Sequence, residues 1–111
     1  MNRPGAEEVI YVAALLTLYV DLPDTPLRHT PMDQSVARKL YQEAVPLSLV
    51  ESALLLATLR RRTRSSELPP LSKIRSLAYF LPVIAELQQQ PLPDGYLDYL
   101  RLKLPRLALP A

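Results

Sequence analysis

Six cationic side chains suited to binding phosphate are concentrated in one short segment of the chain. They follow a largely apolar stretch over residues 45–59 and are six of its thirteen Lys and Arg residues: Arg60, Arg61, Arg62, Arg64, Lys73 and Arg75. Such side chains contact phosphate without reading base sequence, so binding of this kind is sensitive to salt and has little base specificity. We take these six as the candidate nucleic-acid-binding residues.

Two other interpretations of this basic segment stay open. Arg60, Arg61 and Arg62 fall in the last turn of an expected helix, where cations compensate the negative end of the helix dipole and need no ligand. An acidic protein would also bind a cationic surface. Nucleic acid is favoured because the first four cations and the last two lie on either side of one loop and can converge on a single patch.

Charge is divided unevenly along the chain. The formal net charge is +2, yet residues 1–55 carry four cations and seven anions, whereas residues 56–111 carry nine and four. A one-sided basic surface raises the local concentration of polyanions. The expected partner is therefore nucleic acid, most simply DNA, or an acidic protein.

Residues that could support catalysis or bind a metal are scarce. The chain has no glycine-rich phosphate loop, no metal-spaced cluster, no cysteine and one histidine, His29. Asp21 and Asp24 flank Pro23 and are explained by helix termination and a turn. No nucleophile or orienting acid is evident for His29, which is expected to be a solvated loop residue. We expect no enzyme, no catalytic residue, no metal and no cofactor.

Aromatic side chains near the basic segment could stack on the bases of a single strand. Tyr79 and Phe80 lie in an apolar stretch, so at least one of them belongs to the core, and Tyr96 and Tyr99 lie on an expected terminal helix. Packing is the commoner use of such residues. We expect these side chains to lie in the core or at its rim.

The elements that must position these residues are helices. The 111 residues suit one domain, and a leucine-rich composition with only two glycines favours helix over strand. Of the twelve prolines, all except Pro82 lie between periodic segments or in their first turns. The sequence therefore predicts an all-α protein, an irregular orthogonal bundle of four to five helices forming a single domain over residues 1–111.

The first three helices have clear limits. The first is expected from residue 5 or 6 to residue 20 and is apolar nearly all round, so it should be covered on several sides by neighbours or by another subunit. The second begins at Thr30 as the N-cap, with Asp33 completing a capping box. The third begins at Leu47 and is the expected central helix.

The last two helices are interrupted by prolines. The fourth is expected to open at residues 71–72, with a kink or break near residues 79–81 caused by Pro82. The fifth is expected to start at Asp94 as the N-cap and to stop before residues 105–111, which form a frayed tail.

Residues 49–87, "LVESALLLATLRRRTRSSELPPLSKIRSLAYFLPVIAEL", place an acid-containing helix before the basic loop and a helix with Tyr79 and Ile84 after it. This pattern resembles the helical DNA-binding domains of DnaD-like replication-initiation proteins. The chain lacks the tryptophan that those domains typically place after the second helix. The resemblance implies non-specific DNA binding through the basic loop and a part in primosome assembly. We expect a replication or mobile-element protein.

The apolar first helix supports a different function. A helix without a wide polar face can pack against another protein or a second copy, which predicts a protein-interaction or oligomerisation module and a homo-oligomer. Its apolar run, residues 9–20, is shorter than the roughly 20 residues of a membrane span, and Glu7 and Glu8 are unlike the basic start of a secretory signal. We expect no membrane partner and a cytoplasmic location.

Overall fold

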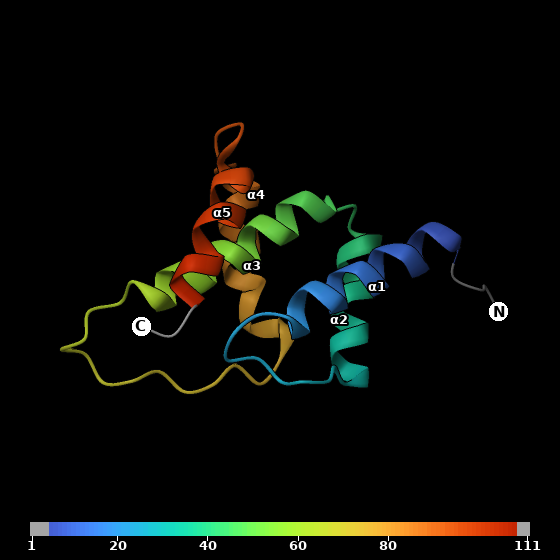
Figure 1. The fold of residues 1–111 in the computed structure, drawn as a ribbon. Helices are drawn as coiled ribbons and strands as arrows, with labels where there is room; N and C mark the ends of the chain where they lie inside the picture. The colour runs from blue at the N-terminus through green and yellow to red at the C-terminus, as the bar shows by residue number, and fades with distance from the viewer. Residues whose placement is uncertain (1–4, 109–111) are drawn as a thin grey trace.

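The computed structural model describes the backbone of residues 5–108 and the side chains of residues 5–104. In this part of the chain it contains five α-helices and one 3-10 helix (Figure 1): α1 (Ala6–Val20), α2 (Pro31–Gln42), α3 (Leu47–Arg62), η1 (Leu77–Phe80), α4 (Leu81–Gln89) and α5 (Tyr96–Ala108). Residues 5–108 include no strand, and the predicted all-α bundle is confirmed.

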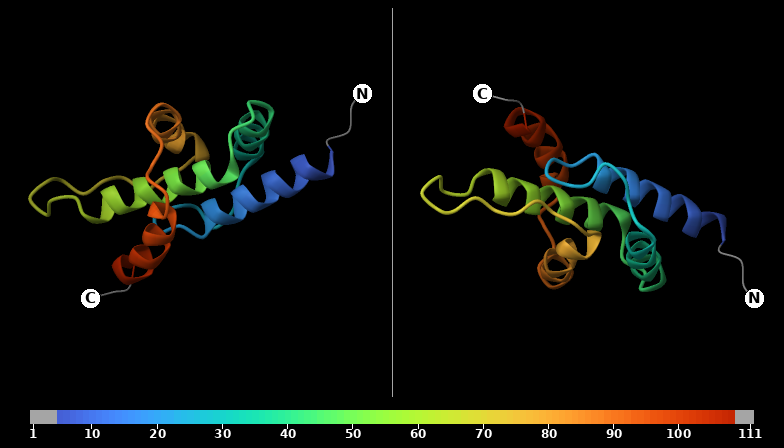
Figure 2. Two further views of the ribbon diagram at one scale, coloured as in Figure 1. Left: turned by 90° about the horizontal axis from the view of Figure 1, so that it is seen from above. Right: turned by 90° about the horizontal axis from the view of Figure 1, so that it is seen from below.

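Helix α3 is the centre of the bundle, as predicted. Helices α1 and α5 lie on one side of it and α2 and α4 on the other (Figure 2). Its buried apolar side chains are Val50, Ala53, Leu54, Leu56 and Ala57. Ser52 and Thr58 are buried as well, and each donates its hydroxyl to a backbone carbonyl one turn earlier at 2.8 Å. Both hydroxyls are therefore satisfied within the helix.

Helix α1 has the predicted limits but is less covered than predicted. Leu15, Leu16 and Tyr19 are buried, whereas the side chains of Val9 and Ile10 are 53% and 67% exposed. The expectation of cover on several sides is thus not met by the described part of the chain. The reason is geometric: the N-terminal half of α1 extends beyond the other helices (Figure 2).

Helix α2 begins with the predicted capping box. Thr30 Oγ1 accepts the Asp33 N–H at 3.2 Å, and Asp33 Oδ2 accepts the Thr30 N–H at 2.9 Å. The remaining oxygen, Oδ1, accepts the N–H of Leu77 at 2.9 Å. This buried carboxylate therefore fixes the start of η1 as well as that of α2.

A Schellman motif ends α2. The Val45 N–H donates to the Leu40 carbonyl at 3.1 Å and the Ala44 N–H to the Tyr41 carbonyl at 2.9 Å. Ala44 adopts φ 58°, a conformation in which glycine is usual. The motif turns the chain sharply, so that Pro46 directly precedes α3.

The predicted helix start at residues 71–72 is wrong. Residues 71–76 have no regular secondary structure, and η1 begins only at Leu77. The N–H of Ile74 donates to the Asp24 carbonyl at 2.8 Å, and that of Leu77 donates to the Asp33 carboxylate. These acceptors are distant in sequence and replace the carbonyls that a helix would have used.

Two prolines are expected from the sequence to interrupt or end the last two helices. The break expected near residues 79–81 is confirmed as the junction between η1 and α4, with Pro82 in the first turn of α4, where a missing N–H costs little. Pro105 lies within α5, so the predicted end of that helix before Pro105 is wrong. Leu100 and Leu104 are buried and anchor the preceding turns of α5.

The start of α5 also differs from the prediction. The helix begins at Tyr96, and the Tyr99 N–H donates to the carbonyl of Gly95 at 3.1 Å, which makes Gly95 the N-cap in place of Asp94. The helical backbone continues to Ala108, so the predicted frayed tail does not begin at residue 105. Residues 109–111 of that predicted tail lie outside the described residues.

Candidate functional site

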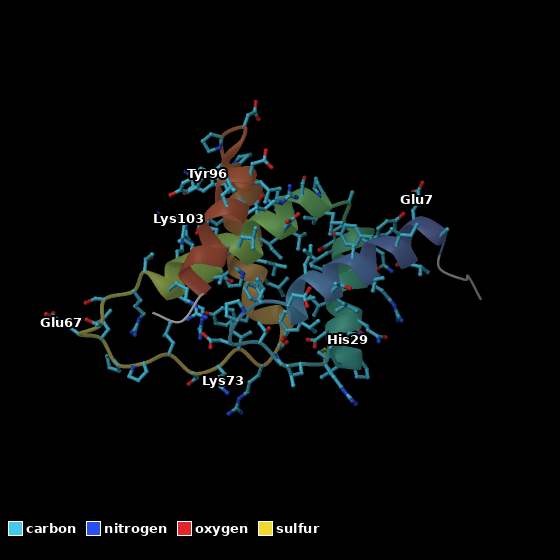
Figure 3. The ribbon with its side chains drawn as sticks, in the orientation of Figure 1. Glu7, His29, Glu67, Lys73, Tyr96 and Lys103 are labelled. Atoms are coloured by element: carbon cyan, nitrogen blue, oxygen red, sulfur yellow. The ribbon has the colours of Figure 1, made fainter. Side chains whose placement is uncertain are left out.

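The basic segment forms a projecting arm, which we define as residues 63–76. It extends past the C-terminal end of α3 and returns to the bundle at η1 (Figure 1). Glu67 lies at its tip, and Lys73 lies on the returning leg and points away from the helices (Figure 3). Within the arm, all residues except Arg64, Ile74 and Ser76 are exposed.

Arg61, the second arginine of the last turn of α3, anchors the arm. Its guanidinium donates to the Ser72 carbonyl at 2.8 Å and to the Tyr79 hydroxyl at 3.1 Å, and it lies 3.6 Å from the Asp24 carboxylate. The guanidinium carbon also lies 5.5 Å from the centre of the Tyr79 ring, within cation–π range. With a side chain only 10% exposed, Arg61 is a structural link between α3, the arm and η1.

Arg60 is held against α4. Its guanidinium donates to both carboxylate oxygens of Glu86, at 3.0 and 2.6 Å. This hydrogen bond raises the pKa of Arg60 and lowers the pKa of Glu86. About half of each side chain remains exposed, so the pair adds little stability, but it links α3 to α4.

Arg64 closes the tip of the arm. Its guanidinium donates to the carbonyl of Pro69, which lies on the opposite leg. The Leu68 N–H donates to the Ser65 carbonyl at 3.2 Å, which forms a turn at the tip. The arm is thus ordered by hydrogen bonds from arginines and by turn chemistry, without a strand pair.

The other three candidate residues are exposed cations. These are Arg62, Lys73 and Arg75. Within residues 5–104, none of them forms an ion pair or a side-chain hydrogen bond. Their charges are therefore available to an external anion.

The structure shows a common hollow for three of the six predicted residues. Three of them, Arg61, Arg62 and Arg64, line an open hollow of about 380 Å³ between the end of α3 and the arm. Lys73 and Arg75 lie on the returning leg, which has no regular secondary structure, and they do not line this hollow.

A second open hollow, of about 330 Å³, lies between α3 and α4. It is lined by Ala57, Arg60, Arg61, Leu71, Tyr79, Pro82 and Val83. The two hollows share Arg61 and Leu71 and are therefore adjacent. The second hollow combines arginines with exposed apolar and aromatic groups, among them Leu71 and Tyr79.

Two residues of this site are not found by sequence reasoning. Asp24, which the sequence assigns to a turn, has φ 66° and meets both Arg61 and the Ile74 N–H. Tyr79 is 45% exposed, whereas Phe80 is fully buried, which confirms that at least one of the two belongs to the core. For Asp24, the only signal in the sequence is the turn-prone Pro23-Asp24 pair. For Tyr79, the sequence shows two adjacent aromatic residues but not which of them is exposed.

His29 is exposed in the loop between α1 and α2. Its Nδ1 lies 3.5 Å from the amide nitrogen of Gln34, and no carboxylate among the described residues contacts it. Within residues 5–104, no three His, Asp or Glu side chains gather in a way that could hold a metal ion.

Comparison with known proteins yields no relative from which a role could be transferred. No family model, no curated protein and no solved structure matches the chain. Between residues 5 and 108, no helix is both long enough and apolar enough to cross a membrane.

Proposed function

We propose that the chain is a nucleic-acid-binding module that holds the phosphate backbone through the exposed cations of the arm and of the adjoining end of α3. The observation that supports this proposal is that Arg62, Lys73 and Arg75 are exposed and unpaired within residues 5–104, while Arg60 and Arg61 are occupied by internal contacts. Arg61 and Arg64 hold the arm by hydrogen bonds, and the exposed cations meet the ligand.

The charge and position of the arm both support phosphate binding. Together, Arg62 and the arm carry four cations and one acid, Glu67. Cations that project from the body can displace the counterions of a polyanion without first breaking internal ion pairs. Helix α3 is enclosed by other helices (Figure 2), and its only exposed residues are Ser48, Arg60 and Arg62, too few to read a base-pair groove, which agrees with low base specificity.

DNA is the nucleic acid proposed, and replication or a mobile element is the proposed setting. Both rest on the resemblance of residues 49–87 to DnaD-like helical domains. Such a module acts by binding, without catalytic residues or a cofactor, and its proposed location is the cytoplasm.

Fluorescence anisotropy with labelled DNA, as a duplex and as a single strand, tests the proposal. We expect a Kd of about 1–100 µM near physiological salt, weakening steeply as salt rises. The triple variant Arg62→Glu, Lys73→Glu, Arg75→Glu should abolish measurable binding. The single variant Lys73→Gln should reduce the slope of log K against log salt by about 1, because one phosphate contact is lost.

A variant of equal charge change provides the control. Arg38→Glu, Lys39→Glu and Lys103→Glu alter exposed cations on α2 and α5 and leave the arm intact. This control should retain most of the affinity, since its cations lie away from the arm. Equal loss in both triple variants would show that net charge alone drives binding, and unchanged affinity in the arm variant would contradict the proposal.

A second candidate function is a protein-interaction or oligomerisation module. It is supported by the exposed face of α1, where Val9 and Ile10 are more than half exposed although both belong to the apolar run of residues 9–20. Ala6, Ala13 and Thr17 are exposed on the same helix. Small residues of this kind allow a second helix to approach closely.

A further inference from the structure

The proposed phosphate contacts involve only cationic side chains and leave Tyr79 and the hollow beside it without a role. The ring is 45% exposed and lines the 330 Å³ hollow with the apolar side chains of Leu71, Pro82 and Val83. An aromatic ring exposed beside apolar groups and flanked by cations has the composition of a base-stacking site. It also lies next to the hollow that Arg62 and Arg64 line.

The ring is held in place by its neighbours. Arg61 donates to the Tyr79 hydroxyl at 3.1 Å and lies 5.5 Å from the ring centre. The Phe80 and Tyr79 rings form a T-shaped pair, with centroids 5.2 Å apart and an interplanar angle of 81°. A ring fixed by these contacts is already oriented before a ligand arrives, so little side-chain freedom is lost on binding.

From this arrangement we infer that the hollow beside Tyr79 binds an unpaired nucleobase, and that the ligand of the arm is a single-stranded nucleic acid. The base lies against the Tyr79 ring, and the phosphates on either side of it meet the cations of the first hollow and the arm. The inference rests on the proposed function and names its substrate class. A duplex cannot fill the stacking site beside Tyr79, because paired bases stack on each other and offer no free face.

The absence of tryptophan from the chain permits a direct test. The variant Tyr79→Trp places a single indole in the hollow. Its fluorescence should be quenched by a thymidine oligonucleotide and not by an abasic oligomer of the same length and charge. The matched control is Tyr99→Trp, at a residue of similar exposure (47%) on α5, and its fluorescence should respond to neither ligand.

Affinity measurements on variants of the hollow complete the test. Tyr79→Ala should weaken single-strand binding by about 5- to 100-fold, the range measured for loss of one stacked base, with the salt dependence unchanged. Tyr79→Phe keeps the ring and should bind within about twofold of the parent chain. Thermal unfolding of each variant verifies that the fold is intact, and the Tyr79→Trp signal does not depend on the alanine variant.

The outcomes separate this inference from the proposed function. Equal affinity for duplex, abasic oligomer and single strand would overturn base stacking while leaving phosphate binding by the arm in place. No binding of any nucleic acid would overturn both. Quenching of the indole by an acidic peptide and not by oligonucleotides would identify the surface as a protein-binding site and overturn the inference.

Discussion

At the residue scale, one buried carboxylate joins segments that are far apart in sequence. Asp33 is 1% exposed, and its two oxygens accept the N–H groups of Thr30 and Leu77, each at 2.9 Å. Hydrogen bonds to an ionised group are stronger than neutral ones. Asp33 therefore stabilises α2 locally and also holds the end of the arm against α2.

We predict that Asp33→Ala lowers the free energy of unfolding by about 2–4 kcal/mol, because both N–H groups lose a charged acceptor. Thr30→Ala should cost only about 1 kcal/mol, since it removes the local cap alone. Urea unfolding measures both, with the exposed Asp94→Ala as a control of little effect. If Asp33→Ala and Thr30→Ala cost the same, the bond to Leu77 contributes nothing.

At the element scale, the arm and α1 are the two parts that extend from the bundle. The arm is held by polar contacts of Arg61 and Arg64, whereas the outer face of α1 has apolar side chains without cover in the described part of the chain. The arm therefore suits an ionic ligand, and α1 suits an apolar one.

The exposed face of α1 leads to a prediction for the second candidate function. If α1 mediates oligomerisation, sedimentation velocity should show a dimer that Ile10→Glu converts to monomer, because a charge would be buried at the interface. Leu102→Glu is the matched control, since Leu102 is 72% exposed on α5. A parent chain that stays monomeric at all concentrations would contradict oligomerisation through α1.

At the scale of the whole molecule, long-range polar contacts join the outer helices to the central part of the bundle. Arg101 of α5 donates to both carboxylate oxygens of Glu51 on α3 at 2.8 and 2.7 Å, and the hydroxyl of Tyr11 on α1 donates to the Val45 carbonyl at 2.8 Å. The Tyr19 hydroxyl is buried and has no hydrogen-bond partner in the described part of the chain.

The buried Tyr19 and the partly buried Tyr11 predict loss of stability at alkaline pH. Burial raises the pKa of Tyr11 to about 12, and burial followed by the charge on Asp33 raises that of Tyr19 to about 12. Unfolded tyrosine ionises near pH 10, so the unfolded state loses protons that the folded state keeps. This contribution is fully present below pH 10 and is lost as the pH rises toward 12, by roughly 2–3 kcal/mol for the buried Tyr19 and by less for the partly buried Tyr11, which solvent screens.

Urea unfolding between pH 8 and pH 12 measures this loss, and Tyr19→Phe provides the control. The variant should show a shallower decline above pH 10. At neutral pH it should be at least as stable as the parent chain, because the hydroxyl it removes has no partner among the described residues. Identical declines would show that Tyr19 titrates like an exposed tyrosine.

The sequence by itself determined the helical class, the first three helices, the capping box at Thr30 and Asp33, and the concentration of cations after α3. All of these depend on local causes, namely periodicity, capping side chains and proline geometry.

Only the tertiary structure decided where the fourth helix begins and which cations remain free. The Asp24 carbonyl and the Asp33 carboxylate take the N–H groups of Ile74 and Leu77, and Glu86 pairs with Arg60. In each of these pairs the two residues are more than 25 positions apart in the sequence, so no local sequence pattern reveals the contact. The candidate site was visible in the sequence as charge, but its free cations and its exposed ring follow from contacts that only folding brings together.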